Sequence, residues 1–236
     1  MSRKIIRAIT ILLFMVIMVF YSIFVHNSFK ESNMDKYNNV EQLINSNIKI
    51  GHVQFDENFS GIEELNRTAE EQLQGYYDAF DDTECIFVVK ATGNIKFSYL
   101  VTFQEMTIEK VIKGNGVEGE KIKCIFEAGR LETTEDGVYL NTFGVNLMQK
   151  DKEYLLFCSS CDMSNYSDEE YYTNKNGICY FSLDNSNIAM VNEDCNLPYD
   201  DESSKYEFYV DCEEAVKSIT EFKAKILDRY YIENKN

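Results

Sequence analysis

Short apolar segments separated by polar turns are the feature that most constrains how this chain can fold. Residues 99–113 read YLVTFQEMTIEKVIK, and a glycine-rich turn at 114–119 separates them from KIKCIFEAG at 121–129. Two further runs, CIFVVKAT at 85–92 and KEYLLF at 152–157, are rich in β-branched and aromatic residues. Runs of this length bounded by turn residues are typical of β-strands. The sequence therefore predicts a mainly β domain with these segments as its central strands.

The longest of these segments changes phase without stopping. Tyr99, Val101 and Phe103 are odd-numbered and share one face, whereas Met106 and Ile108 are even-numbered. Side chains of a strand alternate between two faces, so a phase change indicates one extra residue. We predict a β-bulge near Gln104 and Glu105, which would bend the strand enough to serve a small, coiled antiparallel barrel.

Helical patterns flank the strands. Over 62–80, apolar residues recur at spacings of three and four, which favours an amphipathic helix. A second helix is expected to begin after an N-cap at Asp211 and to bury Val216, Ile219, Phe222, Ile226 and Tyr230. Between them, 178–183 and 188–191 are predicted to form a hairpin, and 161–177 an acidic loop. The fold class is thus mainly β with flanking helices (α+β).

The N-terminal region contains an uninterrupted apolar run of 18 residues, Ala8 to Val25, after a short basic tip. This length approaches that of a transmembrane helix, and no small-residue cleavage site follows it. We therefore expect an uncleaved single-pass anchor rather than a cleaved signal peptide. The basic residues before the span favour a cytoplasmic N-terminus and an extracytoplasmic C-terminal domain. The expected divisions are an anchor at 1–26, a stalk or linker at 27–60 and a folded domain at 61–236.

The charge balance limits the choice of partners. The formal net charge is −17, with 40 acidic and 23 basic side chains. Such a surface repels phosphate backbones, so nucleic acid is excluded as the expected partner. Besides the membrane, the expected partner is a cell-surface protein or a small ligand. No nucleotide-binding or dinucleotide-binding fingerprint is present, and no cofactor is expected.

The order of strands and turns resembles a known kind of bacterial domain. The segments CIFVVKATG, VIKGN, EKIKC and KDKEYLLF follow one another between Cys85 and Cys161, about a third of the chain. This pattern resembles membrane-tethered or lipoprotein-type extracytoplasmic domains with an OB-like barrel, similar to tissue inhibitors of metalloproteinases. The resemblance implies an OB-like antiparallel β-barrel. Those inhibitors bind the protease metal through an N-terminal cysteine, which this chain lacks, so inhibition is not carried over.

Cysteines provide the sharpest local motif, Cys158-Ser159-Ser160-Cys161. A redox-active pair of this spacing normally begins a helix, and no helical pattern follows here. Two disulfides among Cys158, Cys161, Cys179 and Cys195 are our preferred interpretation, with the pairing left open. A zinc site made by the same four residues is the alternative, although the second pair lacks tight ligand spacing.

No catalytic residue, cofactor-binding residue or metal ligand is assigned from these patterns. The sequence predicts a membrane-anchored extracytoplasmic binding or structural module that is not an enzyme. Two alternatives remain open. One is a membrane-tethered thiol-disulfide oxidoreductase that uses Cys158 and Cys161, and the other is a regulator of an extracellular protease.

Overall fold

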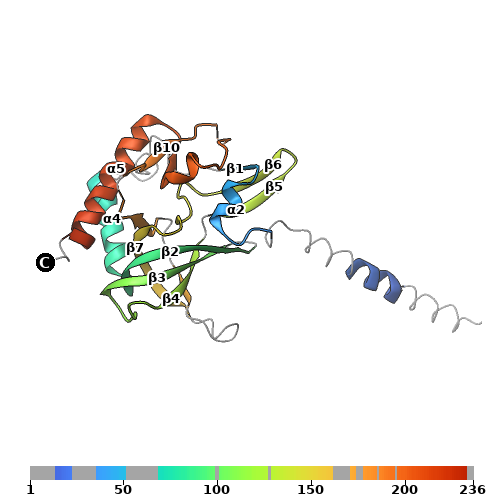
Figure 1. Ribbon diagram of the computed structural model, residues 1–236, viewed down its shortest axis with the longest axis horizontal. Helices are drawn as coiled ribbons and strands as arrows, with labels where there is room; N and C mark the ends of the chain where they lie inside the picture. The colour runs from blue at the N-terminus through green and yellow to red at the C-terminus, as the bar shows by residue number, and fades with distance from the viewer. Residues whose placement is uncertain are drawn as a thin grey trace, which may run out of the picture.

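The fold is organised around a six-stranded sheet with the order β2-β3-β4-β8-β7-β9 (Figure 1). The computed structural model describes residues 14–22, 36–51, 69–98, 101–126, 129–161, 171–173, 178–184, 186–194 and 196–232. The sheet consists of β2 (Cys85–Phe97), β3 (Thr102–Lys113), β4 (Lys121–Phe126), β7 (Glu153–Cys161), β8 (Tyr171–Thr173) and β9 (Tyr180–Ser182). Its pairs are antiparallel except β4 with β8, which run parallel, and β2 pairs with β7 as well as with β3.

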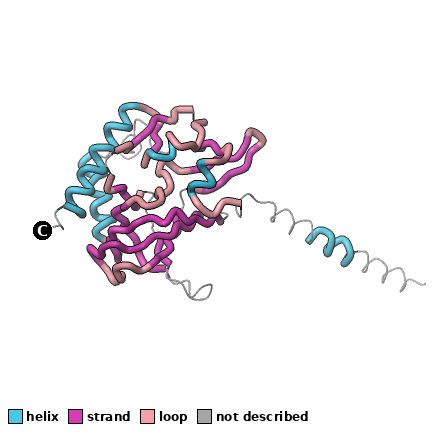
Figure 2. The backbone as a smooth tube through the Cα atoms, viewed as in Figure 1, coloured by secondary structure: helices cyan, strands magenta, loops and turns pink. Residues whose placement is uncertain are grey.

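Two helices lie side by side along one edge of the strands, as Figure 2 shows. They are α4 (Ala69–Asp81) and α5 (Glu213–Leu227). Phe80 of α4 stacks on Phe157 of β7 with ring centroids 4.1 Å apart, and Tyr76 meets Phe222 of α5 edge-on at 4.8 Å. The contact between Phe80 and Phe157 covers one face of β7, and this strand carries consecutive buried residues because both of its faces are covered.

Two smaller sheets lie beside the main one. One has the order β1-β6-β5, made of β1 (Ile48–Ile50), β5 (Arg130–Thr134) and β6 (Gly137–Asn141). The other pairs β10 (Ala189–Val191) in parallel with β11 (Phe208–Val210). The short helix α2 (Val40–Ile44) adds Leu43 to a second apolar core that also contains Ile50, Leu140 and Tyr209. The remaining helical segments are η2 (Ser203–Lys205) and η3 (Asp228–Ile232).

The predicted small, closed OB-like antiparallel β-barrel is wrong. The main sheet curls, because β7 also pairs with β2, but its pairs are not antiparallel throughout. Strand β8 joins β4 in parallel, and five of the strands belong to two separate small sheets. The parallel partner came from 161–177, where the sequence predicted an acidic loop. A three-residue strand is too short to leave a period-two pattern.

Other local predictions are also corrected. The segments 178–183 and 188–191 do not form a hairpin, because β9 pairs with β7 and β10 pairs with β11. The N-cap of α5 is Cys212 rather than Asp211. The predicted buried stripe of this helix is largely confirmed, since Ile219, Phe222 and Ile226 are buried. Residues 62–68 of the predicted first helix lie outside the described residues, and 69–80 are helical in α4.

The predicted membrane anchor is contradicted. Within the described part of the chain, no helix is both long enough and apolar enough to cross a membrane. Of the predicted anchor at 1–26, residues 14–22 are described, and these are helical. This finding overturns the predicted single-pass anchor.

Candidate binding site

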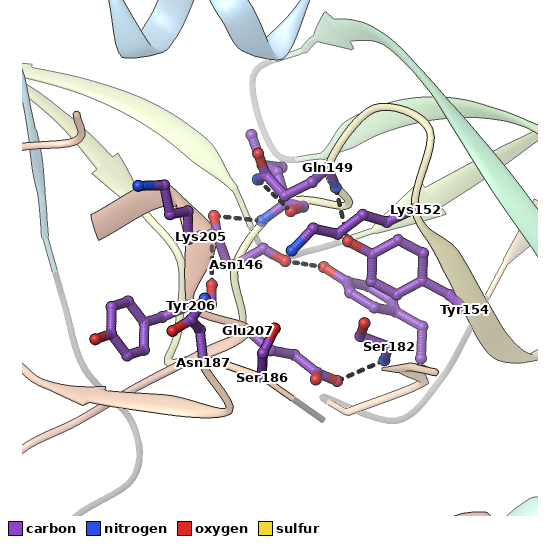
Figure 3. Close-up of a pocket in the computed structure, with 12 residues that line it drawn as sticks. Asn146, Gln149, Lys152, Tyr154, Ser182, Ser186, Asn187, Lys205, Tyr206 and Glu207 are labelled. Atoms are coloured by element: carbon purple, nitrogen blue, oxygen red, sulfur yellow. Dashed lines mark hydrogen bonds between the residues drawn. The ribbon is translucent and has the colours of Figure 1, made fainter. Parts of the chain in front are cut away.

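A polar pocket lies where five segments meet: residues 146–149, the start of β7 with the preceding Lys152, strand β9, residues 186–187 and residues 205–207 (Figure 3). Its volume is about 280 Å³, including space open to solvent, and its enclosed part has room for about one water-sized group. Pairing of β7 with β9 places Tyr154 opposite Ser182, and Tyr180 lies two residues before Ser182. All three side chains therefore share one face of the sheet and line the pocket.

A buried ion pair lies at the edge of this pocket. Lys223 of α5 approaches Glu207 with a nitrogen-to-oxygen distance of 2.5 Å, and the two side chains are 1% and 5% exposed. Lys223 also donates to the backbone carbonyl of Asp184 at 2.9 Å, and Glu207 accepts a hydrogen bond from the backbone N–H of Ser182 at 2.8 Å. The pair thus connects α5 to β9 and to the segment before β11.

Burial has the largest effect on the pKa of Glu207, the acid of this pair. Removal from water raises the pKa of Glu207 to about 7, although the charge and hydrogen bond of Lys223 and the Ser182 N–H act in the opposite direction. A carboxyl group with such a pKa changes its protonation state near neutrality. Strong perturbation by burial next to a pocket is typical of functional sites, although structural ion pairs also produce it.

Asn146 connects the walls of the pocket (Figure 3). Its side-chain amide donates to the carbonyls of Ser204 and Tyr206 at 2.8 and 2.7 Å, and its side-chain oxygen accepts from the Tyr199 hydroxyl at 3.0 Å. Its backbone carbonyl accepts a hydrogen bond from the Tyr180 hydroxyl. Because its polar atoms are occupied by the protein, Asn146 fixes the pocket wall rather than offering bonds to a ligand.

Two side chains retain bonding capacity toward the pocket. The Tyr154 hydroxyl accepts from the backbone N–H of Gln149 at 2.7 Å, and burial raises the pKa of Tyr154, which keeps its hydroxyl protonated. Lys152, two residues earlier on the chain, extends its ammonium group into the pocket (Figure 3). The arrangement can therefore present one positive charge and one hydroxyl donor to a small bound group.

The predicted disulfides are contradicted by the cysteine geometry. The described cysteines are all free thiols, namely Cys85, Cys124, Cys158, Cys161, Cys179 and Cys212. Of the four residues predicted to pair, Cys158, Cys161 and Cys179 are among them, and Cys195 lies outside the described residues. The segment predicted as an acidic loop, 161–177, is therefore not joined to the sheet by a disulfide among the described cysteines.

The CxxC motif lies on a strand rather than at the start of a helix. Because side chains alternate along β7, Cys158 and Cys161 point to opposite faces, and only Cys161 is partly exposed. Cys158 is buried against Cys85 and Cys124, and its hydrogen bond to Cys124, together with burial, raises the pKa of its thiol. A thiol held protonated is a poor nucleophile, so this geometry gives no support to a redox role.

The same geometry speaks against the zinc alternative, since Cys158 and Cys161 point to opposite faces of β7 and cannot bind one ion together. Across the described ranges, no group of three or more histidine, cysteine, aspartate or glutamate side chains is arranged to hold a metal ion.

The pocket residues were not singled out from the sequence. One signal was available, because Lys223 lies four residues after Ile219 and three before Ile226, within the apolar stripe of α5. A lysine on that stripe requires a buried acidic partner. Nothing local identifies Glu207 as that partner, since the two residues are brought together by the packing of α5 on β10 and β11. No family model matches the chain, and neither does any curated protein.

Proposed function

We propose that this chain is a binding module that recognises a small polar group in the pocket between β7, β9 and residues 205–207. The observation that carries the proposal is that the pocket combines a rigid polar wall with hydrogen-bond donors that have no acceptor among the described residues. Asn146 and the Glu207–Lys223 pair are occupied by protein partners, whereas Tyr154 and Lys152 still have donors to offer. Preorganised polar groups in a concave site are the usual means by which a protein orients a ligand.

Thermal unfolding of the full chain tests this proposal. The probes are sodium acetate, acetamide, glucose and choline chloride, each at constant ionic strength. We expect at least one probe, at about ten times its dissociation constant, to raise Tm by roughly 2–4 °C. Replacing the exposed rim residue in Ser186→Trp should block the pocket and remove the shift.

The matched control is Ser218→Trp, which introduces the same side chain at an exposed position of α5 outside the pocket. This variant should respond to the probe as the unmodified chain does. Equal Tm shifts in Ser186→Trp and the unmodified chain, or no shift with any probe, would contradict the proposal. Regulation of a protease stays a prediction that rests on the strand-order resemblance alone.

A further inference from the structure

Lys152 is the pocket residue whose charge is not neutralised by direct contact. Its side chain is half-buried, and its ammonium group points into the pocket (Figure 3). Within the described ranges it forms no ion pair within 4 Å, although buried lysines are normally paired. The other lysine of the pocket behaves differently: Lys205 points away from the centre and pairs with Glu202 at 3.5 Å.

The carboxylates near Lys152 are held by other groups. Glu207 is bound by Lys223 and by the Ser182 N–H. The exposed carboxylate of Asp184 accepts from both the backbone N–H and the hydroxyl of Ser186, at 2.9 and 2.8 Å. The charge of Lys152 acts to lower the pKa of both acids, against the larger effect of burial at Glu207, but neither acid forms an ion pair with it. Its ammonium donors therefore remain available to a group that enters the pocket.

Tyr154 supplies a second donor at the same place. Its side chain is 3% exposed, and its hydroxyl oxygen already accepts from the N–H of Gln149. A phenol has one hydrogen to donate, and among the described residues no acceptor receives it. A buried donor without an acceptor costs free energy, so an acceptor atom in the pocket would relieve that cost.

We propose that the pocket binds a carboxylate, with one oxygen on the ammonium group of Lys152 and with the Tyr154 hydroxyl donating to the same group. This inference rests on the proposed binding function and specifies its ligand. The enclosed space has room for about one water-sized group, which suits a carboxylate oxygen with the rest of the ligand in the open mouth. Charge-assisted hydrogen bonds favour an anion over a neutral isostere. The carboxylate belongs either to a small free acid or to the C-terminus of a peptide.

Calorimetric titration of the full chain at constant ionic strength tests the inference. The probes are sodium acetate, acetamide, and a short neutral peptide with either a free or an amidated C-terminus. Acetate or the free-acid peptide should bind at least about tenfold more tightly than its neutral counterpart. Acetate binding identifies the free-acid source, whereas binding of the free-acid peptide alone identifies the terminal carboxylate. Either result supports the inference.

Two lysine variants form the matched comparison. Lys152→Met should weaken carboxylate binding by about tenfold or more, whereas Lys205→Met should change it by less than about twofold. Tyr154→Phe, checked for an unchanged fold by circular dichroism, should weaken binding several-fold. Equal binding of both acids and their neutral counterparts, or equal losses in the two lysine variants, would overturn the carboxylate assignment.

The outcomes also separate this inference from the proposed function. If glucose binds, if Ser186→Trp removes that binding and if neither acetate nor the free-acid peptide binds, the binding function stands and the carboxylate assignment falls. If no probe binds, both fall.

Discussion

At the scale of single residues, the Glu207–Lys223 pair fixes residues 182–184, of which Ser182 lines the pocket. Both groups are buried, and each also bonds to the backbone of 182–184. Removing one member of a buried ion pair leaves an uncompensated charge, which is far more destabilising than removing both. The pair is thus a structural support for the pocket, and its acid titrates close to neutral pH.

The first residue-scale prediction concerns pH. The pKa of Glu207 is about 7 in the folded chain, against an ordinary value of 4.5. Between these values the folded state binds more protons than the unfolded state, so the free energy of unfolding falls as pH rises. This group contributes a decrease of up to about 3 kcal/mol over that window. Urea unfolding between pH 4.5 and 7 measures it.

The variant for this prediction removes both charges at once. Glu207→Gln combined with Lys223→Met should flatten the decrease without leaving a buried lysine unpaired. Asp184→Asn is the control, since hydrogen bonds from Ser186 lower the pKa of Asp184 and place its titration below the window. A double variant that retains the full slope would show that Glu207 does not titrate there.

At the scale of elements, β3 shows how buried polar residues hide a strand's periodicity. Its alternation is regular, with Thr102, Gln104, Met106 and Ile108 all buried. Thr102 donates to the carbonyl of Gly129, and the side-chain oxygen of Gln104 accepts from Met148. The apparent phase change arose because two of the inward positions are polar, so the predicted bulge in β3 is wrong.

The irregularity opposite Glu105 lies instead in the partner strand, whereas β3 has extra residues only further along, at Glu109 and Ile112. Ala91 pairs with Met106 and Ile95 pairs with Gln104, so three residues of β2 face the single residue Glu105. Gly93 within this insertion has a φ of 83°, and Asn94 donates to the Glu105 carboxylate at 3.0 Å. The prediction located the right part of the β2–β3 pair but the wrong strand.

The turn after β3 yields an element-scale prediction. Gly114 and Gly119 both have positive φ, 95° and 87°. A Cβ at Gly114 would lie 2.6 Å from the carbonyl oxygen of Glu84, whereas a Cβ at Gly119 would meet nothing within 4 Å. Gly119→Ala should cost about 1–2 kcal/mol from backbone strain alone, and Gly114→Ala roughly 3 kcal/mol or more.

Urea unfolding of the two alanine variants gives the comparison directly. Both variants carry the cost of a positive φ at a residue other than glycine. The difference between their free energies of unfolding therefore measures how closely Gly114 approaches the start of β2. Equal losses of stability in the two variants would show that this approach is looser than the structure has it.

At the scale of the whole molecule, the distribution of thiols follows from the packing of the core. Cys85, Cys124, Cys158 and Cys179 are buried within the main apolar cluster, whereas Cys161 and Cys212 are partly exposed. We expect a thiol-reactive probe to label Cys161 and Cys212 first in the native chain. The four buried thiols should react only when the chain unfolds. Their labelling rates should be lower than those of exposed thiols by a factor set by the free energy of global unfolding.

Peptide mass mapping of the labelled chain over time checks this order. Lowering stability with sub-denaturing urea should accelerate the four buried thiols together, because they share one cooperative core. Native-state labelling of Cys158 as fast as that of Cys161 would contradict the burial of the CxxC motif.

Several features were predictable because their signals are local. The strand at 121–126 alternates in polarity, the run at 154–158 is continuously apolar, and α5 repeats its apolar residues at helical spacing. These patterns reflect which side of each element faces the core, which a short window records. The β1–β6 and β10–β11 pairings left no such signal, since each joins only three residues from either strand and the two strands are far apart in the chain.

The sequence by itself determined the mainly β class, the helical stripe of α5 and the acidic charge of the chain. Only the tertiary structure decided how the strands pair, that the described cysteines are free, and that Glu207 and Lys223 meet beside Tyr154 and Lys152. The physical reason is the range of the interactions. Polarity patterns arise within a few residues, whereas the pocket exists only after segments from 146 to 223 have packed together and excluded water from their polar groups.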